Sequence, residues 1–163
     1  MSSVRRRRLV ATSLSAVAIL ALSACGFDEQ TNQQYQPAAG ANYRSATVDV
    51  LNTLLVANAN NSATLSASIV NNTGSDQSLS SVTVDTLDGS KSLPVRSTKI
   101  LLPLPKGSSA TLGQASDAGG FVVTEGAKPG YYVKVTLNFT DAAPVTIEAP
   151  VVARTPDYDF ITG

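Results

Sequence analysis

Apolar and polar side chains alternate with a period of two along most of this chain, and this alternation limits the possible folds more than any other feature. It is clearest over residues 131–139 and recurs over 63–69 and 145–151. Such a period is typical of a β-strand that buries one face and exposes the other. The side chains expected to face the core in the clearest strand are Tyr131, Val133, Val135, Leu137 and Phe139. No segment after residue 43 has the period of an amphipathic helix, so we expect an all-β domain.

Short runs of turn-forming residues separate the alternating segments. These runs are 71–76 (NNTGSD), 88–89 (DG), 103–107 (PLPKG) and 128–130 (KPG). The spacing predicts an antiparallel Greek-key β-sandwich of about seven to eight short strands over residues 44–153. Pro150 predicts that the last strand ends there or lies at an edge of its sheet. Residues 154–163 are expected to form a flexible tail.

The first 25 residues carry a targeting pattern. Four arginines at 5–8 precede an apolar run over 9–22, which is too short for a typical transmembrane helix of about 20 residues. The sequence Leu22-Ser23-Ala24-Cys25 then resembles a bacterial lipobox. This resemblance implies cleavage between Ala24 and Cys25 and a diacylglyceryl group, with fatty acids such as palmitate, on the Cys25 thiol. An ordinary secreted protein with a chance cysteine is the alternative.

We therefore expect residues 1–24 to be a lipoprotein signal peptide and residues 25–43 to be a lipidated flexible tether. Two acyl chains hold a protein stably at a bilayer, whereas one does so only marginally. The predicted location is the extracytoplasmic face of the plasma membrane, with membrane lipid as a partner through the anchor. The arginines do not decide between the general secretory and the twin-arginine export routes.

The composition excludes several classes of function. The chain has no histidine, its only methionine is Met1 and its only cysteine is Cys25. Ser-His-Asp and Cys-His catalysis are therefore excluded, and zinc or copper sites lose their usual ligands. Only carboxylate–oxygen sites for Ca²⁺ or Mg²⁺ remain open. Asp85 and Asp88 flank a turn and are interpreted as turn-stabilising residues. We expect no enzyme activity and no cofactor.

The charge also limits the possible partners. All twelve acidic residues follow Cys25, and four of the twelve basic residues precede it, so the chain from Cys25 onward has a formal charge of −4. A polyanion such as nucleic acid needs a basic surface. We therefore expect no binding of nucleic acid.

From residue 47 to residue 152 the pattern resembles the PCuAC family of periplasmic copper chaperones. The matching stretches are 63–74 (ATLSASIVNNTG), 79–82 (LSSV), 100–103 (ILLP) and 129–139 (PGYYVKVTLNF). The resemblance implies a cupredoxin-like or immunoglobulin-like sandwich. It does not carry over the family's His and Met copper ligands, because residues 120–123 (GFVV) stand where one such pair is expected and no other segment supplies them.

These observations lead to two candidate functions. The first is a membrane-anchored, non-enzymatic interaction or accessory module of the cell envelope, with an envelope protein as a possible partner. The alternative is an envelope protein that binds a small ligand or a metal through loops at the ends of the sandwich. The loops proposed for that role are Gly113–Gly120 and Pro103–Gly107.

Overall fold

The computed structural model describes residues 39–97, 101–113 and 120–161, which belong to one compact unit, Ala38–Gly163. Its strands are β1 (Ala41–Tyr43), β2 (Val48–Ala57), β3 (Ala63–Asn71), β4 (Gln77–Thr86), β5 (Ser92–Leu93), β6 (Val95–Ser97), β7 (Leu102–Leu104), β8 (Ser109–Leu112), β9 (Phe121–Val123), β10 (Tyr132–Phe139) and β11 (Val145–Val152). A 3₁₀ turn, η1 (Pro156–Tyr158), follows the last strand. In the described part of the chain, no helix is long and apolar enough to span a bilayer.

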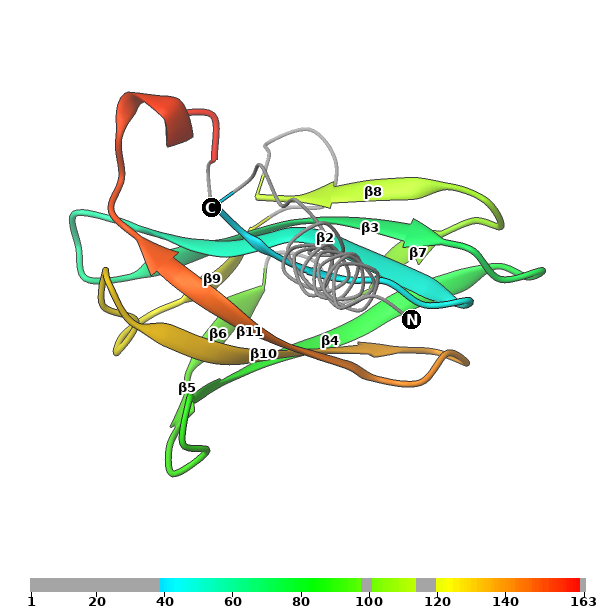
Figure 1. The fold of residues 1–163 in the computed structure, drawn as a ribbon, viewed down its shortest axis with the longest axis horizontal. Helices are drawn as coiled ribbons and strands as arrows, with labels where there is room; N and C mark the ends of the chain where they lie inside the picture. Colours follow the sequence, from blue (N-terminus) through cyan, green and yellow to red (C-terminus); the bar gives the residue numbers. More distant parts are fainter. Residues whose placement is uncertain (1–38, 98–100, 114–119, 162–163) are drawn as a thin grey trace, which may run out of the picture. The chain divides into compact units, whose positions relative to one another are not determined.

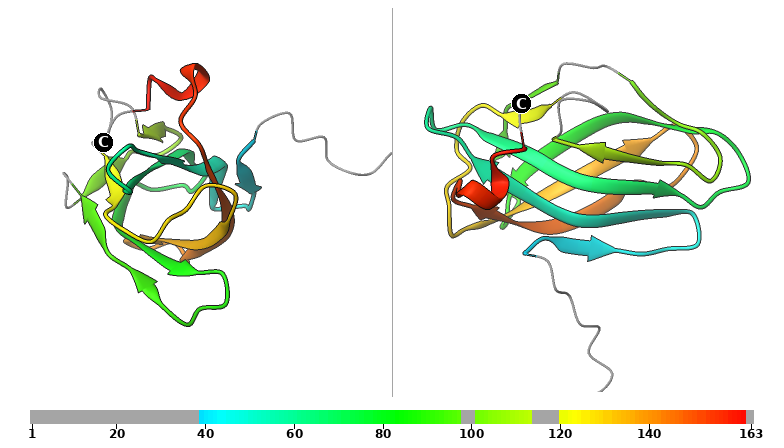
Figure 2. Two further views of the ribbon diagram at one scale, coloured as in Figure 1. Left: turned by 90° about the vertical axis from the view of Figure 1, so that its left-hand side faces the viewer. Right: turned by 90° about the horizontal axis from the view of Figure 1, so that it is seen from above.

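The strands form two layers that face each other. One layer has the order β5-β4-β10-β11, with β7 paired to the start of β4. The other has the order β2-β3-β9-β6, with β1 on β2 and β8 on β3. The layers join where β11 pairs in parallel with β2 at Val151 and Val152. Figure 1 shows the layers one above the other, and the left view of Figure 2 shows the strands around a common interior.

Alternation in the sequence explains the core between the layers. In β10 every second residue from Val133 to Phe139 is buried, and in β11 the same holds from Val145 to Val151. These side chains meet those of β2, β3 and β4 in one cluster of Val, Leu, Ile, Ala and Phe. Burial of such apolar side chains is the main force that holds the two layers together.

The expected all-β sandwich is confirmed, with three local differences. The ladder between β11 and β2 is parallel, whereas the sequence predicted antiparallel pairing throughout. Pro150 lies inside β11 rather than at its end, and the ladder to β2 begins only at the next residue, so the N–H that proline lacks is not needed there. Pro103 lies inside β7, an edge strand on β4, although the sequence predicted a stop at this position.

Both ends of the described unit extend beyond the expected limits of 44 and 153. At the start, Gly40 N–H donates to Asn52 Oδ1 at 3.1 Å, and Asn52 N–H donates to Asn42 Oδ1 at 2.6 Å. A Cβ on Gly40 would lie 2.4 Å from the carbonyl carbon of Asn52, so only glycine fits against this bulge of β2. We call this contact the Gly40 clasp. It fixes β1 beside β2.

Residues 154–161, which the sequence assigned to a flexible tail, fold back on β2. Ile161 is only 2% exposed and packs with Leu54 and Val56 in a small second cluster. The Arg154 guanidinium donates to the carbonyl oxygens of Tyr158 at 3.1 Å and Ile161 at 3.0 Å. It also donates to Asn58 Oδ1 at 2.7 Å. These contacts hold the segment against the end of the sandwich that includes the β2–β3 turn.

Candidate functional site

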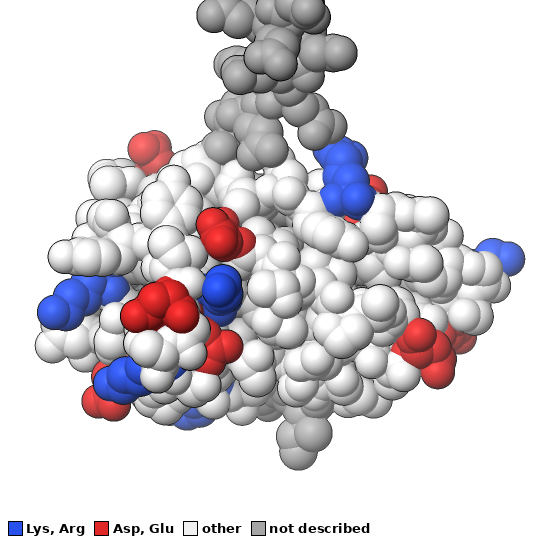
Figure 3. Space-filling model, turned by 60° about the horizontal axis from the view of Figure 1, so that its bottom comes forward, with Lys and Arg blue, Asp and Glu red and all other residues white. Residues whose placement is uncertain are grey.

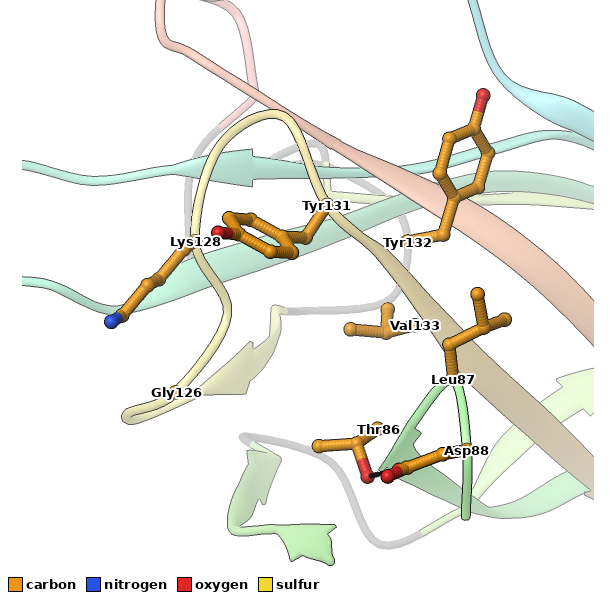
Figure 4. A pocket seen from close by; sticks show the side chains of 8 residues that line it. All are labelled: Thr86, Leu87, Asp88, Gly126, Lys128, Tyr131, Tyr132 and Val133. Atoms are coloured by element: carbon orange, nitrogen blue, oxygen red, sulfur yellow. Dashed lines mark hydrogen bonds between the residues drawn. The ribbon is translucent and has the colours of Figure 1, made fainter. Parts of the chain in front are cut away.

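A groove of about 710 Å³ lies at one end of the sandwich, next to the turn that links β4 and β5. Its volume is within the range of sites for small organic ligands. We call it the tyrosine groove. It is lined by Thr86, Leu87, Asp88, Gly126, Lys128, Tyr131, Tyr132 and Val133. In Figure 4, Tyr131 and Lys128 lie on one side and Thr86 and Asp88 on the other, with Val133 between them and Leu87 below Tyr132.

The groove exposes three large apolar side chains. Tyr131 is 67% exposed, Tyr132 54% and Leu87 44%. Val133, which lies directly opposite Thr86 in the β4–β10 ladder, is buried beside them. A tyrosine offers a flat apolar ring and a hydroxyl that forms hydrogen bonds. Aromatic side chains exposed at the end of the β4–β10 ladder therefore favour a binding role for this end of the sandwich.

The Tyr131 ring is outside the core because of the turn that precedes it. Gly130 has a φ of +86°, which a residue with a side chain rarely adopts. Its N–H donates to Val151 O at 2.8 Å, and Val151 N–H donates to Tyr131 O at 2.8 Å. The turn is thereby fixed to β11, and the regular alternation of β10 begins only at Tyr132. The prediction that Tyr131 faces the core is therefore wrong.

Asp88 gives the groove a fixed negative charge. Its Oδ1 accepts hydrogen bonds from Thr86 Oγ1 at 2.6 Å, from Ser90 N–H at 3.1 Å and from Ser90 Oγ at 2.9 Å. Because these donors favour the ionised form, with Thr86 the largest cause, they lower the pKa of Asp88 to about 2. A carboxylate has further lone pairs for additional donors. Asp88 is thus an ionised acceptor at the rim of the groove at any physiological pH.

The loop opposite Asp88 is held close by a glycine. Gly126 has a φ of +89°, and a Cβ at this position would lie 2.9 Å from Leu93 Cδ2. Leu93 is buried in β5, directly after the turn that carries Asp88. The Gly126 loop therefore packs against a buried leucine of the strand that follows the Asp88 turn. A smaller cavity of about 250 Å³ lies on the other side of this loop, against Asn58 and Ser62.

The end loops predicted to form a site do not line these two cavities. Most of Gly113–Gly120, namely residues 114–119, lies outside the described residues. Pro103–Gly107 lies at the opposite end of the sandwich, where buried Asn71 donates to Leu104 O at 2.9 Å and Asp76 Oδ1 accepts from Lys106 N–H at 2.9 Å. These bonds fasten the loop to the β3–β4 turn.

The other residues singled out from the sequence lie at the β4–β5 turn or outside the described residues. Asp85 accepts a hydrogen bond from Ser92 Oγ and Asp88 from its own turn, which agrees with the turn-stabilising role. Ala24 and Cys25 lie outside the described residues. Sequence reasoning missed Leu87, Tyr131 and Tyr132. The adjacent tyrosines were the available signal, because neighbours in a strand point to opposite faces and one of them must face outward.

The described residues include no group of three or more His, Cys, Asp or Glu side chains that could hold a metal ion. The soft nitrogen and sulfur ligands that copper prefers are limited in the whole chain to Met1 and Cys25. The donor set of the folded unit therefore does not fit a copper site.

Comparison with solved structures identifies the class of fold. The chain is similar to a copper-bound PCuAC domain from PmoF2, with 22% identity and a TM-score of 0.51 over 70% of this chain and 99% of that domain. It is also similar to an apo PCuAC domain from PmoF1, with 23% identity and a TM-score of 0.52 over 70% of this chain and the whole of that domain. No protein-family model and no curated protein matches the chain. The unit thus has the fold of PCuAC domains, as the sequence motifs predicted.

Proposed function

We propose that this protein is a non-enzymatic ligand-binding module of the cell envelope, held at the outer face of the plasma membrane by a lipid on Cys25, and that it binds its ligand in the tyrosine groove. The observation that carries the proposal is the exposure of Tyr131, Tyr132 and Leu87 around one groove at the end of the β4–β10 ladder. Of the two functions considered from the sequence, this geometry favours ligand binding over a purely accessory role.

The similarity to PCuAC domains supports a binding role but not the same ligand. One of the similar structures is a copper-bound domain, so this fold is able to hold a ligand. In the present chain, however, the donor set does not fit copper. The groove instead offers aromatic rings, an aliphatic side chain, one carboxylate and one ammonium group. Such a lining suits an organic ligand.

Metal analysis tests whether the protein binds copper. Protein purified from the membranes of its own host, then incubated with Cu(I) or Cu(II) and desalted, is expected to retain far less than one copper ion per chain. Elemental analysis measures the ratio. Stoichiometric copper would show that our interpretation of the donor set is wrong.

Photo-crosslinking in host cells tests whether the groove is occupied. The photoreactive residue p-benzoylphenylalanine is placed at Leu87 in the full-length chain, and in a control at Ser75, an exposed residue of the β3–β4 turn at the opposite end. Irradiation is expected to give an adduct at position 87 and none at position 75. Equal adducts at both positions, or none at position 87, would contradict the proposed function.

A further inference from the structure

The tyrosine groove opens onto a continuous polar surface on the outside of β4, β10 and β11. We call this surface the outer face. Its side chains are those that alternate with the buried residues of the three strands: Ser81, Thr83, Asp85, Tyr132, Lys134, Thr136, Asn138, Thr146, Glu148 and Pro150. From Tyr132 to Asn138 it extends about 20 Å along β10. Figure 3 looks toward this side of the molecule and shows wide areas without charged residues.

The registers of the ladders arrange these side chains in rows across the three strands. Tyr132 is opposite Pro150 at the groove. In the next row Lys134 lies between Asp85 and Glu148.

Two further rows consist of hydroxyl and amide groups. Thr136 lies between Thr83 and Thr146, with the Thr136 and Thr146 hydroxyl oxygens 3.0 Å apart. Asn138 lies opposite Ser81, and its Nδ2 donates to Ser81 Oγ at 3.0 Å. Each hydroxyl and amide keeps further donors or acceptors for a ligand. Along β10, the apolar row of Tyr132 and Pro150 is therefore followed by rows whose side chains can form hydrogen bonds with a ligand.

The position of this face in the sheet argues against an extended peptide as its ligand. Peptides that add to a sheet use the free backbone groups of an edge strand. β10, the middle strand of this face, pairs with β4 on one side and with β11 on the other. The centre of the outer face therefore offers side chains rather than an open edge.

The charges of the outer face argue against a polyanion. Lys134 is the only basic side chain in the three strands, and it lies between two acids. A polymer of phosphates or uronic acids would need several unpaired basic groups. Aromatic rings at one end, followed by hydroxyls, amides and one lysine flanked by two acids, instead match a polymer whose units have apolar C–H faces and hydroxyl edges.

We infer that the tyrosine groove and the outer face together bind a chain of neutral sugars of the cell envelope. This inference rests on the proposed binding function and names its ligand class. A sugar ring stacks on the exposed face of Tyr132 or Tyr131, where the apolar ring and its hydroxyl are both accessible. Asp88 accepts a sugar hydroxyl at the rim. The following rings run along β10 and exchange hydrogen bonds with the threonine row and with Asn138.

Co-sedimentation of the full-length protein in detergent with insoluble envelope polysaccharide, freed of lipid and protein, tests the inference. Wild type is expected to bind this material, and periodate oxidation of the sugars is expected to abolish binding. Tyr132→Ala removes a stacking ring and should weaken binding about tenfold. Thr136→Val keeps the side-chain shape, removes the central hydroxyl and should weaken binding about fivefold. Circular dichroism checks that each variant is folded.

The matched control is Tyr43→Ala, which removes a half-exposed tyrosine from β1, outside the groove and the outer face. Its affinity should equal that of wild type. Absence of wild-type binding to the polysaccharide would overturn the sugar inference, and so would binding that neither Tyr132→Ala nor Thr136→Val weakens. A cross-link from position 87 to a protein, with no polysaccharide binding, would overturn the sugar inference alone. Absence of any cross-link at position 87 would contradict the proposed function itself.

Discussion

At the scale of single residues, the groove depends on a few positions where a turn brings a side chain out of the regular alternation. Gly130 turns the chain so that Tyr131 remains outside, while Val133 two residues later is buried. Thr86 ends β4, and its hydroxyl holds the carboxylate of Asp88 beside the groove. The chemistry of the site is thus set by the turns, and the strands supply the rigid support.

The hydrogen bonds of Asp88 lead to a testable pKa. Thr86→Val removes the largest cause of its low value, so the pKa of Asp88 should rise from about 2 toward the ordinary 3.8. Because the folded-state pKa is the lower one, these bonds stabilise the turn fully above pH 3.8, and that contribution is lost as pH falls through about 2. Carboxyl NMR titration measures the shift.

The control for this experiment is Thr83→Val, which changes a threonine of the same strand that has no contact with Asp88. It should leave the titration midpoint at about 2. An unchanged midpoint in Thr86→Val would show that Thr86 does not hold the carboxylate.

At this scale the sequence predicted part of the site. The Asp85–Asp88 turn chemistry followed from residue types that form local hydrogen bonds. The groove did not follow, because Leu87 comes from one segment and Tyr131 and Val133 from another, and the two meet only through the β4–β10 register. A pattern within one strand carries no information about that register.

At the scale of elements, residues 154–161 cover a small second cluster on β2 rather than forming a free tail. Arg154 forms three hydrogen bonds that hold the segment in place, and Ile161 packs with Leu54 and Val56. The packing of this segment was hard to predict from the sequence, because a single buried isoleucine among polar residues forms no periodic pattern.

This segment should contribute measurably to stability. Ile161→Ala leaves a cavity in a buried cluster and should lower the free energy of unfolding by about 3 kcal/mol. Phe160→Ala, at the exposed neighbouring position, should change it by less than about 0.5 kcal/mol. Guanidinium unfolding of the full-length chain provides both values. Equal effects of the two variants would mean that the segment does not pack as described.

Long strands were predicted well, whereas β5 and β6 were missed. β3, β10 and β11 have enough alternating residues to define both the element and its inner face. β5 and β6 have only two and three residues, so no period exists to detect. Pro103 was interpreted as a strand end, and Pro150 as a strand end or an edge position, because the sequence does not show which side of each strand is paired.

At the scale of the whole molecule, proteins with the same fold can carry different side chains at the ends of the sandwich. The chain shares the sandwich of PCuAC domains, yet its groove is lined by tyrosines, leucine and a carboxylate. The fold followed from periodicity and turns, which depend on many residues. The ligand depends on a handful of exposed side chains, which is why the fold was predictable and the ligand class required the structure.

The lipid anchor is tested on the whole chain. Cys25→Ser removes the thiol that would carry the diacylglyceryl group and should move the protein from the membrane fraction to the soluble extracytoplasmic fraction. Immunoblotting of fractionated host cells measures the distribution, with Ser23→Ala as a control that keeps the cysteine. Retention of Cys25→Ser in the membrane would mean that another feature holds the protein there.

If the chain is attached at Cys25 as proposed, the Gly40 clasp has a mechanical consequence. A pull that arrives along the chain from Cys25 reaches the described fold first at Gly40, where two hydrogen bonds join it and Asn42 to Asn52. Behind these lies the ladder of β1 with β2, a long strand that pairs along its length with β3. Load from the surface of the cell would therefore be passed directly into the core layer, while the groove at the ends of β4 and β10 lies outside this path.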